Sequence, residues 1–276
     1  MMMRDDEVMV GWQIAPEIRE AMRLERARMA MGQGAFPDVV MELEELLDEN
    51  PEQSDGLFLL GEALIELGDF EGARQAYEHR IEIGAPFAEL WAGLAVARFN
   101  TCDLHGAVSA AREAVRMSPE LGEAHYTLGL ALERLPGEQA GAVSAFAAAH
   151  QLDPQAFPFP LRLQTADWER AVQEALHQLP PSLQQFWAEV PVVLLEVPDL
   201  SELRQATPPI TPTVTGLYQG APPEEVDPWE VRPEALRLYT RNLLRCPSLD
   251  VVIETIAQTL EREGCDWLGV APEELV

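Results

Sequence analysis

Lysine is absent from this sequence of 276 residues, and all 19 basic residues are arginines. Without lysine the chain cannot form a Schiff base with a carbonyl substrate, and it lacks the lysine that phosphate-binding loops and kinases use. The 47 acidic residues give a net charge of −28. Phosphate backbones and anionic lipid surfaces attract cations, so an acidic chain binds them poorly. We therefore expect neither a nucleic-acid partner nor a membrane partner.

Cysteines and long apolar runs are scarce as well. The three cysteines, Cys102, Cys246 and Cys265, show no C-x-x-C spacing, so they suggest neither a disulfide framework nor a thiolate zinc site. No stretch reaches the length of a membrane span, and residues 1–12 lack the apolar core of a signal peptide. We therefore expect a cytoplasmic protein with reduced thiols.

A pattern with a period of 34 residues runs through the N-terminal half. It is clearest from Trp91 to Pro119, which reads W-x-x-L-(small)-x(11)-A-x-x-x-A-x-x-A-x-x-x-x-P. Equivalent positions recur before and after it, giving four units at about 20–53, 54–87, 88–121 and 122–156. The pattern resembles the tetratricopeptide repeat, which implies an all-α superhelix over 20–156. Residues 1–19 would form an N-terminal arm, and Met1 to Ala15 could occupy the repeats' own groove.

Small residues recur at fixed places in these units. Small side chains let the two helices of a pair approach closely, while leucines and aromatic residues fill the seam between pairs. We expect this close approach at Gly61, Ala73, Ala95, Ala107, Gly129 and Ala142.

The resemblance also implies a concave groove for a protein partner, lined by first-helix positions. These positions are apolar or acidic here: Leu24, Phe58, Glu62, Ile65, Glu89, Phe99, Tyr126 and Leu130. Repeat domains of this family that clamp a carboxylate use lysine, asparagine and arginine, which this groove mostly lacks. We therefore expect a basic or amphipathic segment as the partner. The alternative is that these side chains pack against the other half or face solvent.

From Phe157 the 34-residue pattern fades, and a different domain is predicted over 157–276. An amphipathic helix over 168–178 could link the halves or cap the last repeat. Strands are predicted over 190–197, a buried apolar run, and over 215–220 and 235–244, with a loop over 198–214. A final helix over about 251–267 would be capped by Ser248 and ended by Gly269. This combination indicates a small α+β domain.

The C-terminal blocks V-P-V-V-L-L-E-V-P, G-L-Y-Q-G-A-P, R-L-Y-T-R-N-L-L and T-L-E-R-E-G-C-D-W-L-G-V stand in a fixed order. They resemble the minimal zincin-like metallopeptidase domains of bacteria. That family carries H-E-x-x-H, two histidines four apart on a helix that bind zinc and a glutamate that activates water. Here the five positions read Arg262, Glu263, Gly264, Cys265 and Asp266, and no histidine follows His177. The resemblance therefore carries over the fold but neither a metal, a cofactor nor a catalytic residue.

We expect the degenerate motif to serve structure. Arg262 and Glu263 would form an ion pair or a solvated face, and Cys265, Trp267 and Leu268 would face the core. The former cleft would then dock a partner around Tyr218, Tyr239, Arg241 and Trp267. The predicted function is a non-catalytic adaptor with two protein-binding surfaces. Two alternatives stay open: an atypical metallopeptidase with a non-histidine site around Asp266, and a regulator of a bacterial small GTPase and its activating protein.

Overall fold

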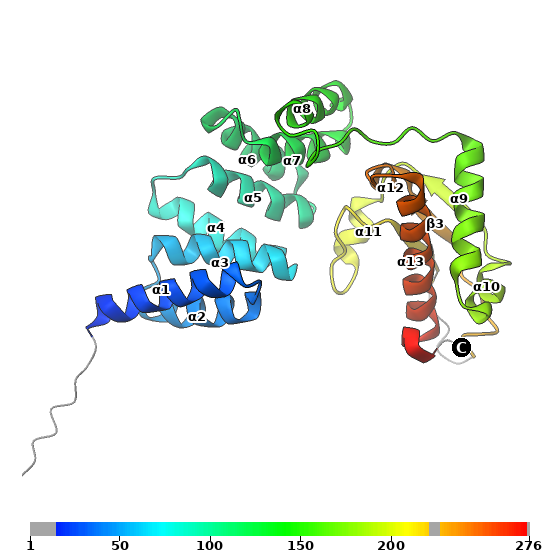
Figure 1. The fold of residues 1–276 in the computed structure, drawn as a ribbon, viewed down its shortest axis with the longest axis horizontal. Helices are drawn as coiled ribbons and strands as arrows, with labels where there is room; N and C mark the ends of the chain where they lie inside the picture. The colour runs from blue at the N-terminus through cyan, green and yellow to red at the C-terminus, as the bar shows by residue number, and fades with distance from the viewer. Residues whose placement is uncertain (1–14, 221–226, 275–276) are drawn as a thin grey trace, which may run out of the picture.

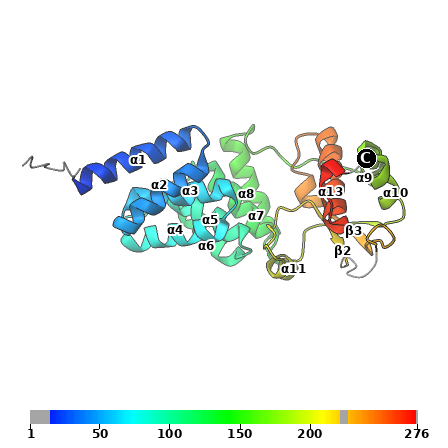
Figure 2. The same ribbon diagram turned by 90° about the horizontal axis from the view of Figure 1, so that it is seen from below.

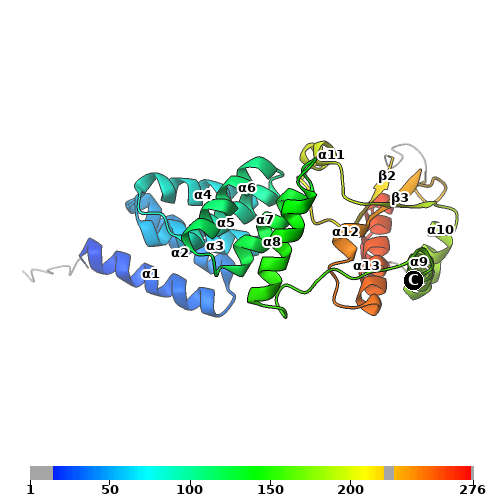
Figure 3. The same ribbon diagram turned by 90° about the horizontal axis from the view of Figure 1, so that it is seen from above.

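The structure is a computed structural model that describes residues 15–220 and 227–274. Figures 1, 2 and 3 show two halves, a stacked array of helices α1 to α8 and a second body that contains α9 to α13 and a small sheet. The predicted fold class, an all-α array followed by a small α+β domain, is confirmed. The proposal that Met1 to Ala15 fills the groove concerns residues of which 1–14 lie outside the described ranges.

The helical array consists of four consecutive helix pairs: α1 Pro16–Gly32 and α2 Phe36–Glu49, α3 Ser54–Leu67 and α4 Phe70–Ile83, α5 Ala88–Asn100 and α6 Leu104–Met117, α7 Gly122–Glu133 and α8 Gln139–Leu152. Helices α3, α5 and α7 start 34 residues apart. The second helix of two pairs begins with an aspartate cap, because Asp69 accepts a hydrogen bond from the backbone N–H of Gly72 and Asp103 from that of Gly106.

The predicted close approach of the paired helices is confirmed. All six small residues are buried. A Cβ atom at Gly61 would lie 2.4 Å from the Tyr77 ring, and one at Gly129 would lie 2.6 Å from the Phe146 ring. Glycine at these two positions therefore lets an aromatic side chain of the second helix lie directly on the backbone of the first.

The C-terminal half packs a three-stranded sheet and several helices around α13 Leu249–Leu268. Strand β3 Ala235–Tyr239 lies in the middle, parallel to β1 Val192–Leu195 and antiparallel to β2 Gly216–Gln219. The remaining elements are α9 Thr165–Gln178, α10 Pro181–Trp187, α11 Leu200–Gln205, α12 Thr240–Leu243 and the 3-10 helix η1 Pro272–Glu274. Ser248 caps α13 and Gly269 ends it with φ of 65°, both as predicted.

Three predictions for this half need correction. The apolar run over 190–197 forms an edge strand, and its side chains Val193, Leu194 and Leu195 are 39–40% exposed instead of buried. The strand predicted over 235–244 ends at Tyr239 and continues as α12. The predicted loop over 198–214 contains α11. Apolar residues in short runs fit either helical or strand spacing, so periodicity alone could not separate these outcomes.

Helix α9 does not cap the last repeat. Its buried residues Trp168, Ala171 and Ala175 belong to the same core as the α13 residues Val252 and Ile256. Figure 1 shows α9 on the far side of the second body, reached from α8 by an extended segment. The helix is therefore part of the C-terminal domain.

The two halves meet at the C-terminal end of α7. Glu133 accepts hydrogen bonds from Arg241 at 3.2 Å and from Arg245 at 2.6 Å, and the next residue, Arg134, donates to the Asn242 side chain at 2.6 Å. A second contact comes from α11, where Leu200 packs on the core of the third and fourth repeats. Charged side chains of both halves are thus neutralised across one interface.

Among the described helices, none combines the length and the apolar character that a membrane crossing would require.

Candidate functional site

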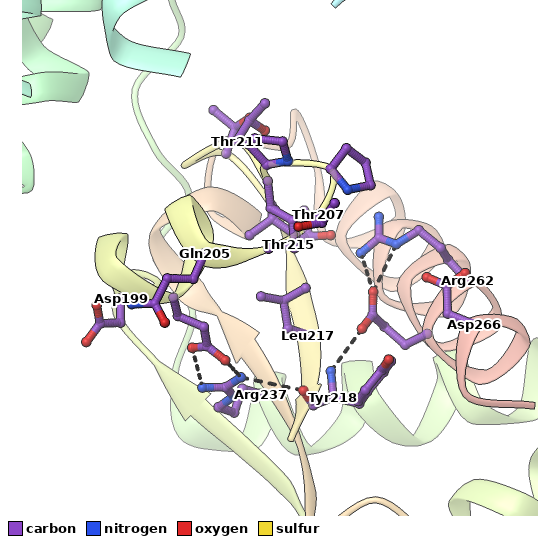
Figure 4. Close-up of a pocket in the computed structure, with 18 of the residues that line it drawn as sticks. Asp199, Gln205, Thr207, Thr211, Thr215, Leu217, Tyr218, Arg237, Arg262 and Asp266 are labelled. Atoms are coloured by element: carbon purple, nitrogen blue, oxygen red, sulfur yellow. Dashed lines mark hydrogen bonds and ion pairs between the residues drawn. The ribbon is translucent and has the colours of Figure 1, made fainter. Parts of the chain in front are cut away.

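A cleft of the C-terminal half has a volume of about 1140 Å³ and lies beside α13. The segment from Asp199 to Thr215, which includes α11, forms one wall. Strand β2 and the α13 residues Arg262, Glu263 and Asp266 form the other (Figure 4). The cleft therefore contains all three charged positions of the degenerate motif.

Arg262 and Glu263 bind the free edge of β2. Glu263 accepts a hydrogen bond from the backbone N–H of Tyr218 at 2.9 Å (Figure 4). Arg262 donates to the backbone carbonyl of Gly216 at 3.1 Å. The two side chains also pair with each other at 2.9 Å. Backbone groups that an edge strand would offer to another strand are thus already satisfied by side chains of α13.

The carboxylate of Glu263 is almost fully buried, with 3% of its surface exposed. Burial raises its pKa, while the hydrogen bond from Tyr218 and the nearby Arg262 guanidinium act in the opposite direction. Both of its oxygens accept hydrogen bonds. Glu263 therefore lies in the wall of the cleft and binds both the β2 edge and the Arg262 guanidinium.

The repeats carry a second cavity of about 350 Å³ on the face formed by their first helices. Its walls are apolar and aromatic, with Phe58 and Tyr77 among them. Four carboxylates face it, Glu62 and Glu66 from α3, Glu89 from α5 and Glu123 from α7. We call this cavity the acidic pocket.

Models of known protein families match both halves of the chain. Two models of the tetratricopeptide repeat match residues 30–97 and 93–157, and a model of the zincin-like metallopeptidase matches residues 187–276. The chain joins tetratricopeptide repeats to a zincin-like metallopeptidase domain. The repeats give the chain a protein-interaction module. A search of the curated proteins found no match.

Solved structures resemble the tetratricopeptide half. A crystal structure of the MamA protein covers 50% of this chain and 75% of its own, with 20% identity and a TM-score of 0.47. MamA 41-end from Desulfovibrio magneticus RS-1 covers 51% of this chain and 77% of its own, with 19% identity and a TM-score of 0.45. YrrB, described as a TPR protein with an unusual peptide-binding site, covers 48% and 68%, with 17% identity and a TM-score of 0.44.

Zinc is the metal that a zincin-like fold implies, but the residues present do not fit it. Arg262 carries a permanent positive charge at a ligand position, and the oxygens of Glu263 are already engaged. Within residues 15–220 and 227–274, no group of three or more histidine, cysteine, aspartate or glutamate side chains is arranged to hold a metal ion.

The structure separates the residues predicted to form a docking surface in the zincin-like cleft. Tyr218 lines the cleft, as predicted. Tyr239 is fully buried in the central strand, and Trp267 is 2% exposed beneath the Tyr218 ring at a centroid distance of 5.3 Å, so neither can dock a partner. Arg241 pairs with Glu133 and Glu196 instead of facing the cleft. The expected core positions of Cys265, Trp267 and Leu268 and the Arg262–Glu263 ion pair are confirmed.

The predicted groove positions also divide into two groups. Phe58, Glu62, Ile65 and Glu89 line the acidic pocket. Leu24, Phe99 and Leu130 are at most 8% exposed inside the core clusters, and Tyr126 packs against Phe146 and Phe157. The prediction is wrong for Leu24, Phe99 and Leu130, because neighbouring side chains of the core cover them, while Tyr126 is half-buried and its binding role stays a prediction.

Glu123 and Tyr77 are the polar residues of the acidic pocket that sequence reasoning missed. Glu123 stands 34 residues after Glu89, so the repeat register already held the signal for it. Tyr77 comes from a second helix, which the groove prediction did not consider. It reaches the pocket across Gly61 and Gly93, where added Cβ atoms would lie within 2.6 Å of its ring.

The carboxylates of the acidic pocket lack arginine partners. None of the four appears in an ion pair among the described residues, whereas Glu42 and Glu78, elsewhere in the repeats, bind arginines. Burial raises the pKa of Glu62, and the charges of Glu123 and Glu66 raise it further. Burial likewise raises the pKa of Glu123. Negative charge in this pocket is thus held without compensation.

The burial of Glu62 and its repulsion by Glu123 and Glu66 predict that the stability of the repeats changes with pH. Because the folded-state pKa of Glu62 lies above its unfolded value of 4.5, its protonated form favours the folded repeats. That contribution is fully present below the unfolded value and is lost as pH rises through the folded pKa. Glu62→Gln is therefore expected to raise the melting temperature at pH 7 and to change it little at pH 4. Thermal melts at both pH values test this, and an equal effect at both would contradict it. Glu113→Gln, at an exposed pair with Arg116, is the control.

Proposed function

We propose that this chain is a non-catalytic adaptor, in which the tetratricopeptide repeats bind a basic segment of a protein partner and the zincin-like domain serves as a rigid second body. The absence of catalysis is proposed from the hydrogen bonds that Glu263 makes. Its carboxylate accepts hydrogen bonds from Tyr218 and Arg262, and these contacts hold the β2 edge. A glutamate whose two oxygens hold a backbone N–H and a neighbouring guanidinium serves as a structural acceptor, and this use supports the non-catalytic proposal.

The charge of the repeats supports a basic partner. The acidic pocket combines apolar walls with four carboxylates that no arginine of the described residues neutralises. A partner segment with a positive side chain flanked by apolar residues would complement both features. The ion pairs of Glu133 across the interface would transmit the position of a bound segment to the zincin-like domain as one rigid unit.

Docking of a second partner in the zincin-like cleft around Tyr218 is a proposal, supported by the size of that cleft. Regulation of a small GTPase and residual metallopeptidase activity stay predictions, since no contact in the structure favours either of them. A cytoplasmic location also stays a prediction.

Selection of displayed random peptides on the full-length chain tests the adaptor proposal. Enriched sequences are expected to be rich in basic residues next to apolar ones. Phe58→Glu should abolish their binding, because it removes the aromatic wall against which the apolar and basic side chains of the peptide would pack. Val143→Glu, at an apolar residue of α8 that is 69% exposed, is the matched control and should bind normally. Enrichment of acidic sequences, or binding that survives Phe58→Glu, would refute the groove as the partner site.

A further inference from the structure

The acidic pocket contains an unusual polar group besides its carboxylates. The Tyr77 side chain is 2% exposed and lines the pocket, yet its hydroxyl makes no hydrogen bond with any of the described residues. This hydroxyl is not one of the fully buried polar atoms that lack a partner among the described residues, so it is accessible from the pocket and can form a hydrogen bond with a group bound there. The Tyr77 side chain lies against Gly93, where an added Cβ atom would be only 2.8 Å from the Tyr77 hydroxyl oxygen. This close packing fixes the side-chain conformation of Tyr77.

The charges around this hydroxyl come from three helices. Glu62, Glu66 and Glu123 are the carboxylates whose fields act on the Tyr77 hydroxyl, and Glu89 lines the same cavity. The described lining residues include no arginine or histidine. No three acidic side chains of the described residues are close enough to hold a metal ion. The carboxylates therefore suit an extended cationic group whose hydrogen-bond donors are several ångströms apart, and not a single metal ion.

An arginine side chain has these properties. Its guanidinium carries five N–H donors in one plane, whereas lysine presents a compact ammonium. It also stacks on aromatic rings, and Phe58 is part of the pocket wall. The chain's own arginines already pack in this way, with Arg245 lying 4.5 Å from the Phe146 ring centroid and Arg134 lying 5.1 Å from that of Phe99.

We propose that the acidic pocket is a specificity site for one arginine side chain of the partner, which stacks beside Phe58 and donates hydrogen bonds to Tyr77 and the surrounding carboxylates. This inference rests on the proposed function of the groove and names the residue type that the groove selects. Uncompensated charge in the acidic pocket reduces the stability of the free protein. A bound arginine would neutralise this charge and donate a hydrogen bond to the Tyr77 hydroxyl, which gives these features a functional reason.

Methyl NMR of the full-length chain, labelled at isoleucine, tests this proposal. Ile65 lines the acidic pocket, and Ile256 is buried in the zincin-like core as an internal control. Titration with N-acetyl-arginine N-methylamide is expected to shift the Ile65 signal saturably, with a dissociation constant on the order of 1 mM, and to leave Ile256 unchanged. The isosteric, neutral citrulline probe should bind at least about tenfold more weakly, and the lysine probe several-fold more weakly.

Variants locate the contacts. The double variant Glu62→Gln and Glu123→Gln, and separately Tyr77→Phe, should weaken arginine binding, the double variant by about tenfold. Glu113→Gln should not weaken it. Equal binding of citrulline, equal binding of lysine, or no saturable shift of Ile65 would each overturn the proposal. If selected peptides still bind in a Phe58-dependent manner while the arginine probe fails, the arginine pocket is refuted and the adaptor function stands.

Discussion

Replacing Glu263 with alanine is expected to destabilise the zincin-like domain by about 2–4 kcal/mol, because a buried backbone N–H of Tyr218 and the Arg262 guanidinium lose their acceptor. Glu263→Gln should cost less, since its amide oxygen can still accept from Tyr218 and a neutral side chain avoids the burial penalty that raises the pKa of Glu263. Urea unfolding followed by tryptophan fluorescence measures both changes.

The sign of this change separates two roles for Glu263. A glutamate held in a desolvated site for catalysis weakens the fold, and its removal commonly stabilises the protein. A glutamate that closes the β2 edge has the opposite effect. Asp266→Ala is the matched control, since Asp266 is exposed on the same helix and should change stability by less than about 0.5 kcal/mol. Equal stability of the Glu263→Ala and Asp266→Ala variants would contradict the structural role.

Arg134→Met is expected to cost about 3–5 kcal/mol and to separate the two halves. The Arg134 side chain is 1% exposed and donates to the carbonyls of Leu130 and Pro212 and to the Asn242 side chain. Burial lowers its pKa to about 10, so the charge is held at a cost that these acceptors offset. Methionine keeps much of the volume but leaves the acceptors buried without their donor.

Separation of the two halves in the Arg134→Met variant can be measured directly. Calorimetry should show two transitions in place of one, and small-angle scattering should report a larger radius of gyration. Arg116→Met serves as the control, because its side chain is 68% exposed and pairs with Glu113 only at i,i+3 spacing. If both variants melted alike and kept the same radius, Arg134 would not hold the halves together.

The repeats could be predicted from sequence because their contacts are local. A glycine or alanine at a fixed place, such as Gly61, and a cap such as Asp69 report on neighbouring turns of the same helix pair. The acidic pocket was only partly predictable. Glu123 follows from the 34-residue register, but Tyr77 enters the pocket only because two glycines of different repeats let its ring pass.

The zincin-like half was predicted less completely because its outcome depends on long-range contacts. The residues of β1 are all apolar, yet the strand lies at the edge of the sheet and Leu194 is exposed. Motif spacing suggested that Trp267 belongs to the cleft surface, but the Tyr218 ring covers it. The Arg262–Glu263 pair was foreseen as an ion pair, while its binding to the β2 edge needed the three-dimensional arrangement.

Zinc content and peptide hydrolysis, measured together on the purified chain, test the non-catalytic assignment most directly. The protein would be dialysed against zinc and analysed for bound metal, and a broad peptide library would be assayed with the wild type and with Glu263→Gln. We predict far less than one zinc ion per chain and no hydrolysis that depends on Glu263. One zinc ion per chain, together with hydrolysis that Glu263→Gln abolishes, would contradict the assignment and establish a metallopeptidase.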